Sequence, residues 1–406
     1  MDFPVLKNQN LLGKKVLLRV DINSPLDPVS GEILDDTRIK SILPTLECLN
    51  HAKTILLAHQ SREGKMDFTT LELHAETLQG LDDLKVKYVD DTFGPKAQSE
   101  INNLNNGEIL LLENVRFCAE ENSPKVISQS PFEQLKTNFV RQLSSSCNFF
   151  VNDAFAVSHR TQPSVVAFPY VMPSCAGNVM ELEIISLSKV RTSNKSPKTF
   201  LFGGAKARDS LQVIKRLLED ELADFVLTTG IVGNLFLIAE GINLGTKNKE
   251  YLSNCGLLEL IPLAKELLKK YREKIKFPLD LAFEKEGSRV ESESTNFPNF
   301  KIMDIGIETI AEYINIIEES KVVVANGPCG VFEIDSFAIG TEEILKAIAK
   351  TKGFSVIGGG HLSTSAQNLD ITDKISYVST GGKATMYFLA GYKLPGIEAL
   401  KIDKLS

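Results

Sequence analysis

The chain has few of the residues from which metal centres and disulfide frameworks are built. Its 406 residues include five histidines and no tryptophan, and its six cysteines stand singly, without a C-x-x-C pair. Structural zinc sites and disulfide frameworks need such residues at short, regular spacings. We therefore expect neither, and we interpret the cysteines as reduced thiols in a cytoplasmic protein. They are Cys48, Cys118, Cys147, Cys175, Cys255 and Cys329.

Long apolar runs and an excess of basic residues are missing too. No apolar run reaches the roughly 18–20 residues that a membrane-spanning helix needs, and the start, MDFPVLKNQN, lacks the basic and apolar regions of a signal peptide. The formal net charge is −7. Because binding a nucleic-acid backbone requires a basic surface, this charge disfavours such a partner. We expect neither a membrane nor a nucleic acid as partner.

Four common catalytic signatures do not occur in the chain. These are the P-loop pattern GxxxxGK[ST], the dinucleotide fingerprint GxGxxG, the hydrolase elbow GxSxG and the zinc-protease motif HExxH. Their absence argues against the corresponding nucleotidase, nicotinamide, hydrolase and metalloprotease chemistries.

What the chain does contain is a long alternation of short apolar runs and helical stretches. Continuous apolar runs are typical of strands that are covered on both faces, and repeated strand–helix alternation predicts parallel sheets. Since one hydrophobic core rarely serves 406 residues, we expect an α/β protein with two domains. The expected strands are 14–22, 54–59, 85–89, 108–115 and 149–155, then 198–203, 224–230, 275–283, 301–306, 321–327, 354–359 and 375–381.

The expected helices include 37–51, 250–274 and 341–352, the first of them broken or kinked at Pro44. The stretch 178–190 reads as one amphipathic helix that joins the two sheets. We therefore predict an N-terminal domain, a connecting segment with this helix, a C-terminal domain and a tail. Their limits are 1–165, 166–190, 191–388 and 389–406.

In the first half, cationic side chains follow the apolar runs. Ligands bind at the carboxyl ends of parallel strands, so these side chains should meet at one edge of a sheet. If these cations lay together in a partly buried site, they would repel one another by about 1 kcal/mol or more unless an anion lay among them. Each cation taken alone reads more readily as a solvated residue, and Asp21 and Asn23 read equally as turn residues. As a group the cations predict a site for phosphate or carboxylate. The cations are Arg38, His59, Arg62, Arg116 and Arg160.

In the second half, the apolar runs end in glycine. The segments LFGGAK, ANGPCGVFE, VIGGGH and STGGK begin at residues 201, 325, 356 and 379. Glycine lets the backbone approach a ligand closely, and a helix N-terminus favours anions. This half therefore predicts a polyphosphate site, with Glu333 either accepting from ribose hydroxyls or solvated. Cations on one domain and glycine turns on the other suggest phosphoryl transfer.

These motifs closely resemble the phosphoglycerate kinase family. They occur in the family's order from residue 14 to residue 400, so the resemblance covers almost the whole chain. The segments that carry it are RVDINSPLD, DDTRI, AHQSR, LLLENVRF, FVNDAFAVSHR, GGAKARD, ANGPCGVFE, VIGGG, STGG and LPGIEAL.

The resemblance implies two Rossmann-like lobes joined by a helix, with a C-terminal tail that returns to the N-terminal lobe. It implies reversible phosphoryl transfer between 1,3-bisphosphoglycerate and MgADP, giving 3-phosphoglycerate and MgATP, in a cytoplasmic monomer or homodimer. The transfer would occur in line at a cleft that closes by hinge motion, and Glu183 matches a glutamate of the hinge region. Because the nucleophile is already ionised, catalysis would consist of positioning and charge neutralisation.

The resemblance also assigns roles to residues of this chain, while no protein ligand of Mg²⁺ is assigned. The 3-phosphoglycerate site would consist of Asp21, Asn23, Arg38, His59, Arg62, Arg116 and Arg160. The nucleotide site would consist of Gly203, Gly204, Lys206, Asn326, Pro328, Glu333, Gly358, Gly359 and Gly360. The catalytic groups would be Arg38, Lys206, Gly381 and Gly382.

Five positions depart from the commonest family pattern. Ser210 replaces a lysine, Ala325 a tryptophan and His361 an aspartate, and these three resemble the archaeal branch of the family. Gln162 replaces a histidine and Lys383 a glycine. We hypothesise that the Lys383 ammonium, at a helix start facing the phosphates, replaces the charge lost at residue 210.

Two other functions remain open at this point. A nicotinamide-dependent dehydrogenase also has two Rossmann-like lobes, although the missing GxGxxG counts against it. A catalytically altered homologue that acts as a nucleotide-binding regulatory protein would explain the changes at residues 210, 361 and 383. The presence of both Arg38 and Lys206 argues against that alternative.

Overall fold

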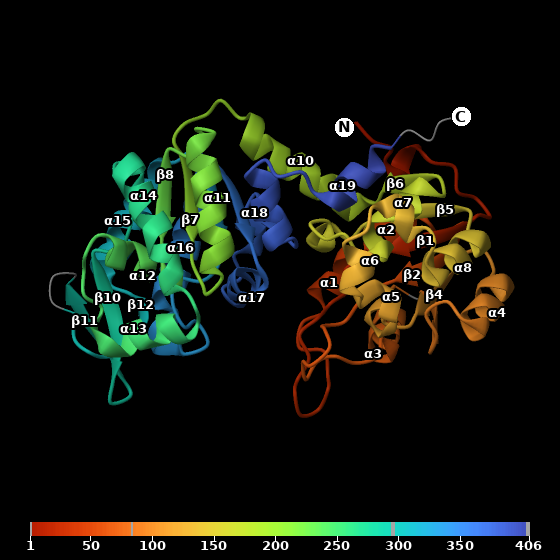
Figure 1. The fold of residues 1–406 in the computed structure, drawn as a ribbon, viewed down its shortest axis with the longest axis horizontal. Helices are drawn as coiled ribbons and strands as arrows, with labels where there is room; N and C mark the ends of the chain where they lie inside the picture. The colour runs from red at the N-terminus through yellow and green to blue at the C-terminus, as the bar shows by residue number, and fades with distance from the viewer. Residues whose placement is uncertain (1, 83, 294–296, 403–406) are drawn as a thin grey trace. The chain divides into compact units, whose positions relative to one another are not determined.

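The structure is a computed structural model that describes residues 2–82, 84–293 and 297–402. It divides the chain into two compact units. The first contains the described residues up to Ile185 together with those from Lys393 onward, and the second contains Ser186–Tyr392. In Figure 1 the first unit is drawn mainly in red to yellow, with the blue helix α19 (Pro395–Leu400) among its elements, and the second in green to blue.

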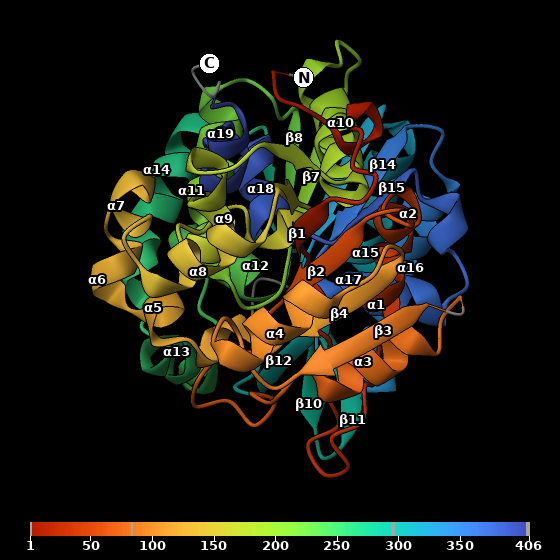
Figure 2. The same ribbon diagram turned by 90° about the vertical axis from the view of Figure 1, so that its right-hand side faces the viewer.

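The first unit is built on a sheet of six parallel strands: β1 (Lys15–Arg19), β2 (Lys53–Leu57), β3 (Lys85–Val89), β4 (Glu108–Leu112), β5 (Phe149–Asn152) and β6 (Ser174–Ala176). Their order is β3-β4-β2-β1-β5-β6, and β1, β2, β4 and β3 run side by side in Figure 2. The five strands expected from the sequence are present. The sixth, β6, lies in the segment that the sequence assigned to the connection.

The helices of the first unit cover both faces of its sheet. They are η1 (Leu6–Asn8), α1 (Thr37–Ser41), α2 (Leu43–Cys48), α3 (Glu72–Gln79), α4 (Pro95–Asn103), η2 (Val115–Phe117), α5 (Ala119–Asn122), α6 (Pro124–Ile127), α7 (Pro131–Gln134), α8 (Asn138–Ser146), η3 (Phe155–Val157), α9 (Pro163–Val166), η4 (Phe168–Tyr170) and α19. The helix α10 (Asn178–Thr192) begins in the first unit and continues into the second, which starts at Ser186. Leu18 and Leu56 pack in one cluster with α1, α2 and α3, whereas Leu17 and Ile55 pack in another with α4 and α8. Burial on both faces explains the continuous apolar runs.

The helix expected over 37–51 is broken, as predicted, next to Pro44. It forms α1 and α2, and Pro44 lies in the first turn of α2, where its missing N–H costs nothing. The expected tail forms α19, which contacts α9. The N–H of Gly396 donates to the carbonyl oxygen of Ser158 at 2.8 Å, which ties this tail to the first unit.

The second unit has its own sheet of six parallel strands: β7 (Lys198–Phe202), β8 (Phe225–Thr228), β9 (Ile275–Lys276), β13 (Val322–Asn326), β14 (Phe354–Gly358) and β15 (Tyr377–Ser379). Their order is β15-β14-β13-β7-β8-β9. Its helices are α11 (Ala207–Glu219), α12 (Gly230–Ala239), α13 (Gly245–Asn254), η5 (Leu258–Leu260), α14 (Ile261–Tyr271), α15 (Ile307–Glu319), α16 (Asp335–Lys350), α17 (Gly360–Asn368), η6 (Thr372–Lys374) and α18 (Lys383–Leu389).

Two expectations for the second unit were wrong in detail. The single strand expected over 275–283 is two strands, because β9 ends at Lys276 and β10 (Asp280–Lys285) pairs antiparallel with β11 (Ser288–Glu293) and β12 (Lys301–Ile305). The single helix expected over 250–274 is split into α13, η5 and α14. Gly256 has φ of +65° between the first two pieces, a conformation that glycine adopts without strain.

Each sheet has one switch point, where the connections from two neighbouring strands run to opposite sides of the sheet. In the first sheet the neighbours β1 and β5 lead to β2 on one side and β6 on the other. In the second sheet the neighbours β7 and β13 lead to β8 and β14 in the same way. Ligands of open α/β sheets bind at such switch points, beyond the carboxyl ends of the strands.

Within the part of the chain that the structure describes, no helix is both long and apolar enough to cross a membrane. The same residues contain no group of three histidine, cysteine or acidic side chains placed to hold a metal ion.

Candidate functional site

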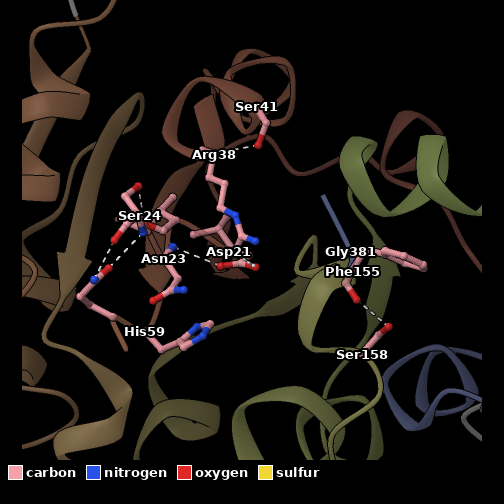
Figure 3. Close-up of polar contacts among 12 residues, drawn as sticks. Asp21, Asn23, Ser24, Arg38, Ser41, His59, Phe155, Ser158 and Gly381 are labelled. Carbon is pink, nitrogen blue, oxygen red and sulfur yellow. Dashed lines mark hydrogen bonds and ion pairs between the residues drawn. The ribbon is translucent and has the colours of Figure 1, made fainter. Parts of the chain in front are cut away.

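A partly buried ion pair joins Asp21, in the loop after β1, to Arg38 on α1 at the switch point of the first sheet. Asp21 accepts a hydrogen bond from Nη1 of Arg38 at 2.8 Å and another from the N–H of Asn23 at 3.1 Å (Figure 3). Burial alone would raise the pKa of Asp21. The positive charge of Arg38 and smaller contributions from its neighbours outweigh burial and hold the pKa below its usual value. Asp21 is therefore an ionised group that fixes the direction of Arg38.

His59, at the end of β2, is buried beside this pair. Its Nδ1 lies 3.3 Å from Nη2 of Arg19, and because a guanidinium can only donate, Nδ1 is the acceptor and the ring proton is on Nε2. Burial is the main cause that lowers the pKa of His59 well below its usual value. Asp21 opposes this shift, while Arg19 adds to it. His59 is thus a neutral donor at neutral pH rather than the cation that the sequence suggested.

Arg19, which the sequence analysis missed, is the buried centre of this group. Its exposed fraction is 2%, its Nε donates to Oγ of Ser164 at 3.1 Å, and the Ser164 hydroxyl donates to Glu121 at 2.5 Å. Glu121 is also 2% exposed, and burial raises its pKa despite the opposing charge of Arg19. The available signal was an arginine flanked on both sides by apolar residues within the run VLLRV.

The remaining predicted arginines belong to the same electrostatic field. Arg116 follows β4 and donates from Nη1 to the carbonyl oxygen of Ser61 at 2.5 Å. Burial lowers its pKa to about 10, and the positive charge of Arg160 contributes. Arg160 is half-buried, and its Nε has no hydrogen-bond partner within the described residues. Burial lowers the pKa of Arg160; Asp21 opposes this shift, and the charge of the exposed Arg62 adds to it. The fold therefore gathers these cations, as predicted, on one edge of the first sheet.

In the second unit, the loops after β7 and β13 meet at the other switch point. The N–H of Gly203 donates to Asn326 at 2.9 Å, and that of Gly204 to Pro328 at 2.8 Å. A Cβ on Gly203 would overlap the carbonyl oxygen of Pro328, and Gly327 has φ of +86°. Glycine is required in these two loops because their backbones touch.

These loops line a cavity of about 200 Å³, which we call the glycine cavity. Of the predicted nucleotide residues, Glu333 and Gly358 do not line it. The predicted catalytic residue Gly381 does not line it either, and its N–H donates instead to Oγ of Ser379 at 3.1 Å. The residues on its wall that the sequence singled out are Gly203, Gly204, Lys206, Ser210, Asn326, Pro328, Gly359, Gly360, His361, Gly382 and Lys383.

Lys383 lies on the wall of the glycine cavity and is held by Asp209. Its Nζ is 2.8 Å from Oδ1 of Asp209, which also accepts from the hydroxyl of Tyr387 at 3.0 Å. Burial would lower the pKa of Lys383, but Asp209 and Tyr387 more than compensate and raise it. Lys383 is thus a cation that faces the same cavity as Ser210.

A second cavity, of about 550 Å³, adjoins the first, and we call it the large cavity. Gly204, Pro328 and His361 line both cavities. The His361 ring packs against Phe332, with centroids 4.9 Å apart, and Glu333 lies on the rim in an exposed position. Apolar side chains of Ile231, Leu252, Leu281 and Met303 form much of its wall.

Residues 6–392 match the sequence profile of the family described as phosphoglycerate kinase. The chain belongs to the phosphoglycerate kinase family. Phosphoglycerate kinase of Methanothermus fervidus is 47% identical over 96% of this chain and 94% of that protein, and the enzyme of Methanobacterium bryantii is 46% identical over 100% and 98%. The crystal structure of phosphoglycerate kinase from Pyrococcus horikoshii superposes with a TM-score of 0.92 at 42% identity, covering 98% of both chains.

Family membership confirms the resemblance that the motifs indicated, including its similarity to archaeal relatives. It also confirms the two Rossmann-like lobes with parallel sheets and the expected enzyme class, the kinases of glycolysis that bind ATP. The dehydrogenase alternative is wrong.

Proposed function

We propose that the chain transfers a phosphoryl group reversibly between 1,3-bisphosphoglycerate and ADP, forming 3-phosphoglycerate and ATP, with the first unit binding the glycerate and the second the nucleotide. The observation that carries this proposal is the contrast between the two switch points. One gathers five arginines around two buried carboxylates, and the other brings glycine backbones together around a cavity with Lys206 and Lys383.

On the glycerate side, each group has a separate task. Arg62, Arg116 and Arg160 supply charge for a phosphate or carboxylate, whose planar oxygens suit the guanidinium fork. Asn23 and the neutral His59, with its proton on Nε2, suit hydroxyl and carboxyl oxygens. Asp21 holds Arg38 in place, so that the guanidinium is positioned before the ligand binds.

On the nucleotide side, the glycine cavity would hold the phosphates and the large cavity the nucleoside. Glycine N–H groups and the Lys206 ammonium suit phosphate oxygens. Glu333, on the rim of the large cavity, suits ribose hydroxyls. The acceptor oxygen is ionised at neutral pH, so the reaction needs no general base, and Arg38 and Lys206 would act by neutralising charge on the transferring group.

Mg²⁺ fits this site as an ion that arrives with the nucleotide. Mg²⁺ usually keeps several waters and binds through phosphates plus one or two carboxylates. Asp209 supplies the one carboxylate that lines the glycine cavity within the described residues, and its Oδ1 is shared with Lys383. We therefore name Asp209 as the chain's candidate ligand; the bound ion would reduce the negative charge of the terminal phosphates.

The direct test is ATP consumption coupled to the formation of 1,3-bisphosphoglycerate. The expected result is turnover that requires ATP, Mg²⁺ and 3-phosphoglycerate together, with no detectable hydrolysis of ATP when 3-phosphoglycerate is left out. Binding of MgADP without any turnover would overturn the proposal and support a nucleotide-binding regulatory protein instead.

Lys383 supports a more specific expectation. Replacing it by the family's glycine removes a cation from the glycine cavity, so we expect the KM for MgATP to rise about tenfold, while Lys383→Arg stays within about threefold of the unchanged protein. The double variant Lys383→Gly/Ser210→Lys restores a cation from the buried Ser210 position and should recover most of the loss. Steady-state kinetics at low ionic strength measures all three.

An exposed ion pair contributes little to stability, about 0–1 kcal/mol. The side chains of Lys383 and Asp209 are 35% and 36% exposed. If Lys383 did no more than form this exposed pair, Lys383→Gly would leave the KM for MgATP unchanged. That result would end the charge-replacement hypothesis.

A further inference from the structure

Two buried side chains on the wall of the large cavity, Asn234 and Asp304, each have an oxygen that lacks a partner among the described residues. Asn234 lies on α12 with an exposed fraction of 6% and lines this cavity. Its Oδ1 is fully buried and accepts no hydrogen bond within the described residues. A buried amide without a partner costs free energy, so its retention on this wall points to a ligand that pairs with it.

Asn248, another buried polar residue on the same wall, has its hydrogen bonds satisfied by the protein. Asn248 donates to the carbonyl oxygens of Leu244 at 2.7 Å and Phe300 at 2.8 Å, and it accepts from the N–H of Ile302 at 3.0 Å. Its amide therefore serves the fold. The contrast singles out Asn234, whose surroundings include the apolar side chains of Ile231 and Leu281.

Asp304 is the third buried polar residue of this wall, and its unpaired oxygen is closed off from a ligand. Its Oδ2 accepts from Arg289 at 2.9 Å and from the N–H of Gly340 at 2.8 Å. Its Oδ1 has no partner among the described residues, but this oxygen is enclosed by the backbone of Gly330 and Gly340, where a Cβ would overlap it. No base could reach that oxygen.

We infer that Asn234 reads the base of the nucleotide and selects adenine by its 6-amino edge. An asparagine amide offers an acceptor and a donor side by side, and adenine offers the matching donor N6–H beside an acceptor ring nitrogen. The same amide cannot form both bonds with a purine that lacks the 6-amino group. This inference rests on the proposed function, which assigns the large cavity to the nucleoside.

The apolar wall strengthens this selection. Ile231, Leu252 and Leu281 can cover the faces of a flat base but cannot distinguish one base from another. A polar group buried among these apolar side chains decides which base is bound. A base that cannot pair with this group loses a hydrogen bond, and water cannot replace that bond in the filled cavity. Within the described wall, Asn234 is placed to do this.

The test compares ADP with purine riboside 5′-diphosphate, which lacks only the 6-amino group, by calorimetric titration of the full-length protein with Mg²⁺. The unchanged protein should bind ADP about tenfold more tightly than the analogue. Asn234→Leu, which keeps the volume and removes the amide, should bind the two nucleotides equally. Asn254→Leu, an exposed asparagine at the end of α13, serves as the matched control and should keep the tenfold preference.

A preference for ADP that persists in Asn234→Leu would overturn the inference, as would an unchanged protein that binds both nucleotides equally. The second outcome needs no variant and so does not depend on whether Asn234→Leu folds. Failure of the proposed function looks different, because the unchanged protein would then bind neither nucleotide or show no 3-phosphoglycerate-dependent turnover.

Discussion

Replacing Arg38 by alanine is expected to lower kcat by about 10³-fold, because single preorganised donors to developing negative charge contribute on this order. Arg38 is held by Asp21 through a 2.8 Å ion pair, so its guanidinium is already positioned in the protein. The variant also removes the charge that lowers the pKa of Asp21, which leaves a buried carboxylate facing the substrate. Both effects act against an anionic ligand. Coupled-assay kinetics measures the loss.

Two comparisons make this prediction specific. Arg38→Lys keeps a charge without the planar fork and should retain intermediate activity, while Lys40→Ala, which removes an exposed cation from the same helix, should match the unchanged protein. The Kd for MgADP should stay constant in all three, since the cavity residues belong to the other unit. A kcat within tenfold of the unchanged protein for Arg38→Ala would contradict the assigned role.

Replacing Arg19 by methionine is expected to destabilise the protein by about 3–5 kcal/mol, the usual cost of leaving a buried charge without its partner. Arg19 is almost fully buried, and its partner Glu121 is reached through the hydroxyl of Ser164. Without the guanidinium, Glu121 would carry an uncompensated charge in the interior. Urea unfolding followed by circular dichroism measures the change.

The stability loss of Arg19→Met should depend on pH, because its cause is the charge of Glu121. A carboxyl whose folded-state pKa is raised binds its proton more readily in the folded protein, so the penalty in Arg19→Met should shrink as the pH falls and Glu121 becomes neutral. The double variant Arg19→Met/Glu121→Gln should recover part of the loss at neutral pH. Arg141→Met, at an exposed position on α8, should change stability by less than about 0.5 kcal/mol. An equal loss at all pH values would contradict the role of Glu121.

The basic residues of the first site could be predicted because their signal is local. Arg38, His59 and Arg116 each follow an apolar run or begin a helix, and strands that end at one edge of a sheet bring such residues together. Arg19 gave the opposite signal, since it stands inside the run, where a charged residue suggests a strand end or an exposed edge. Its burial is supported by Glu121, about a hundred positions away in the chain, and that pairing depends on the folded structure.

Two features of the second unit could not be predicted for the same reason: they depend on contacts between distant segments. The run 275–283 reads as one strand because strand propensity does not say which neighbour a residue pairs with; the register with β8 ends at Lys276, and β10 pairs elsewhere. Asn234 carries no signal at all in the sequence, since one asparagine in an apolar helix such as α12 resembles any tolerated polar residue.

The sequence by itself determined the family, the two parallel sheets, the division into a cationic half and a glycine half, and most of the residues at both switch points. It could do so because apolar periodicity, strand-end position and glycine turns are properties of short segments. Only the tertiary structure decided that His59 is neutral, that Arg19 and Glu121 lie buried together and that Lys383 is held by Asp209. It also decided that Asn234 lines the large cavity with an Oδ1 that accepts no hydrogen bond from the described residues. Each of these depends on burial and on contacts between distant segments, and the charge state or hydrogen bonding of a side chain follows from those surroundings.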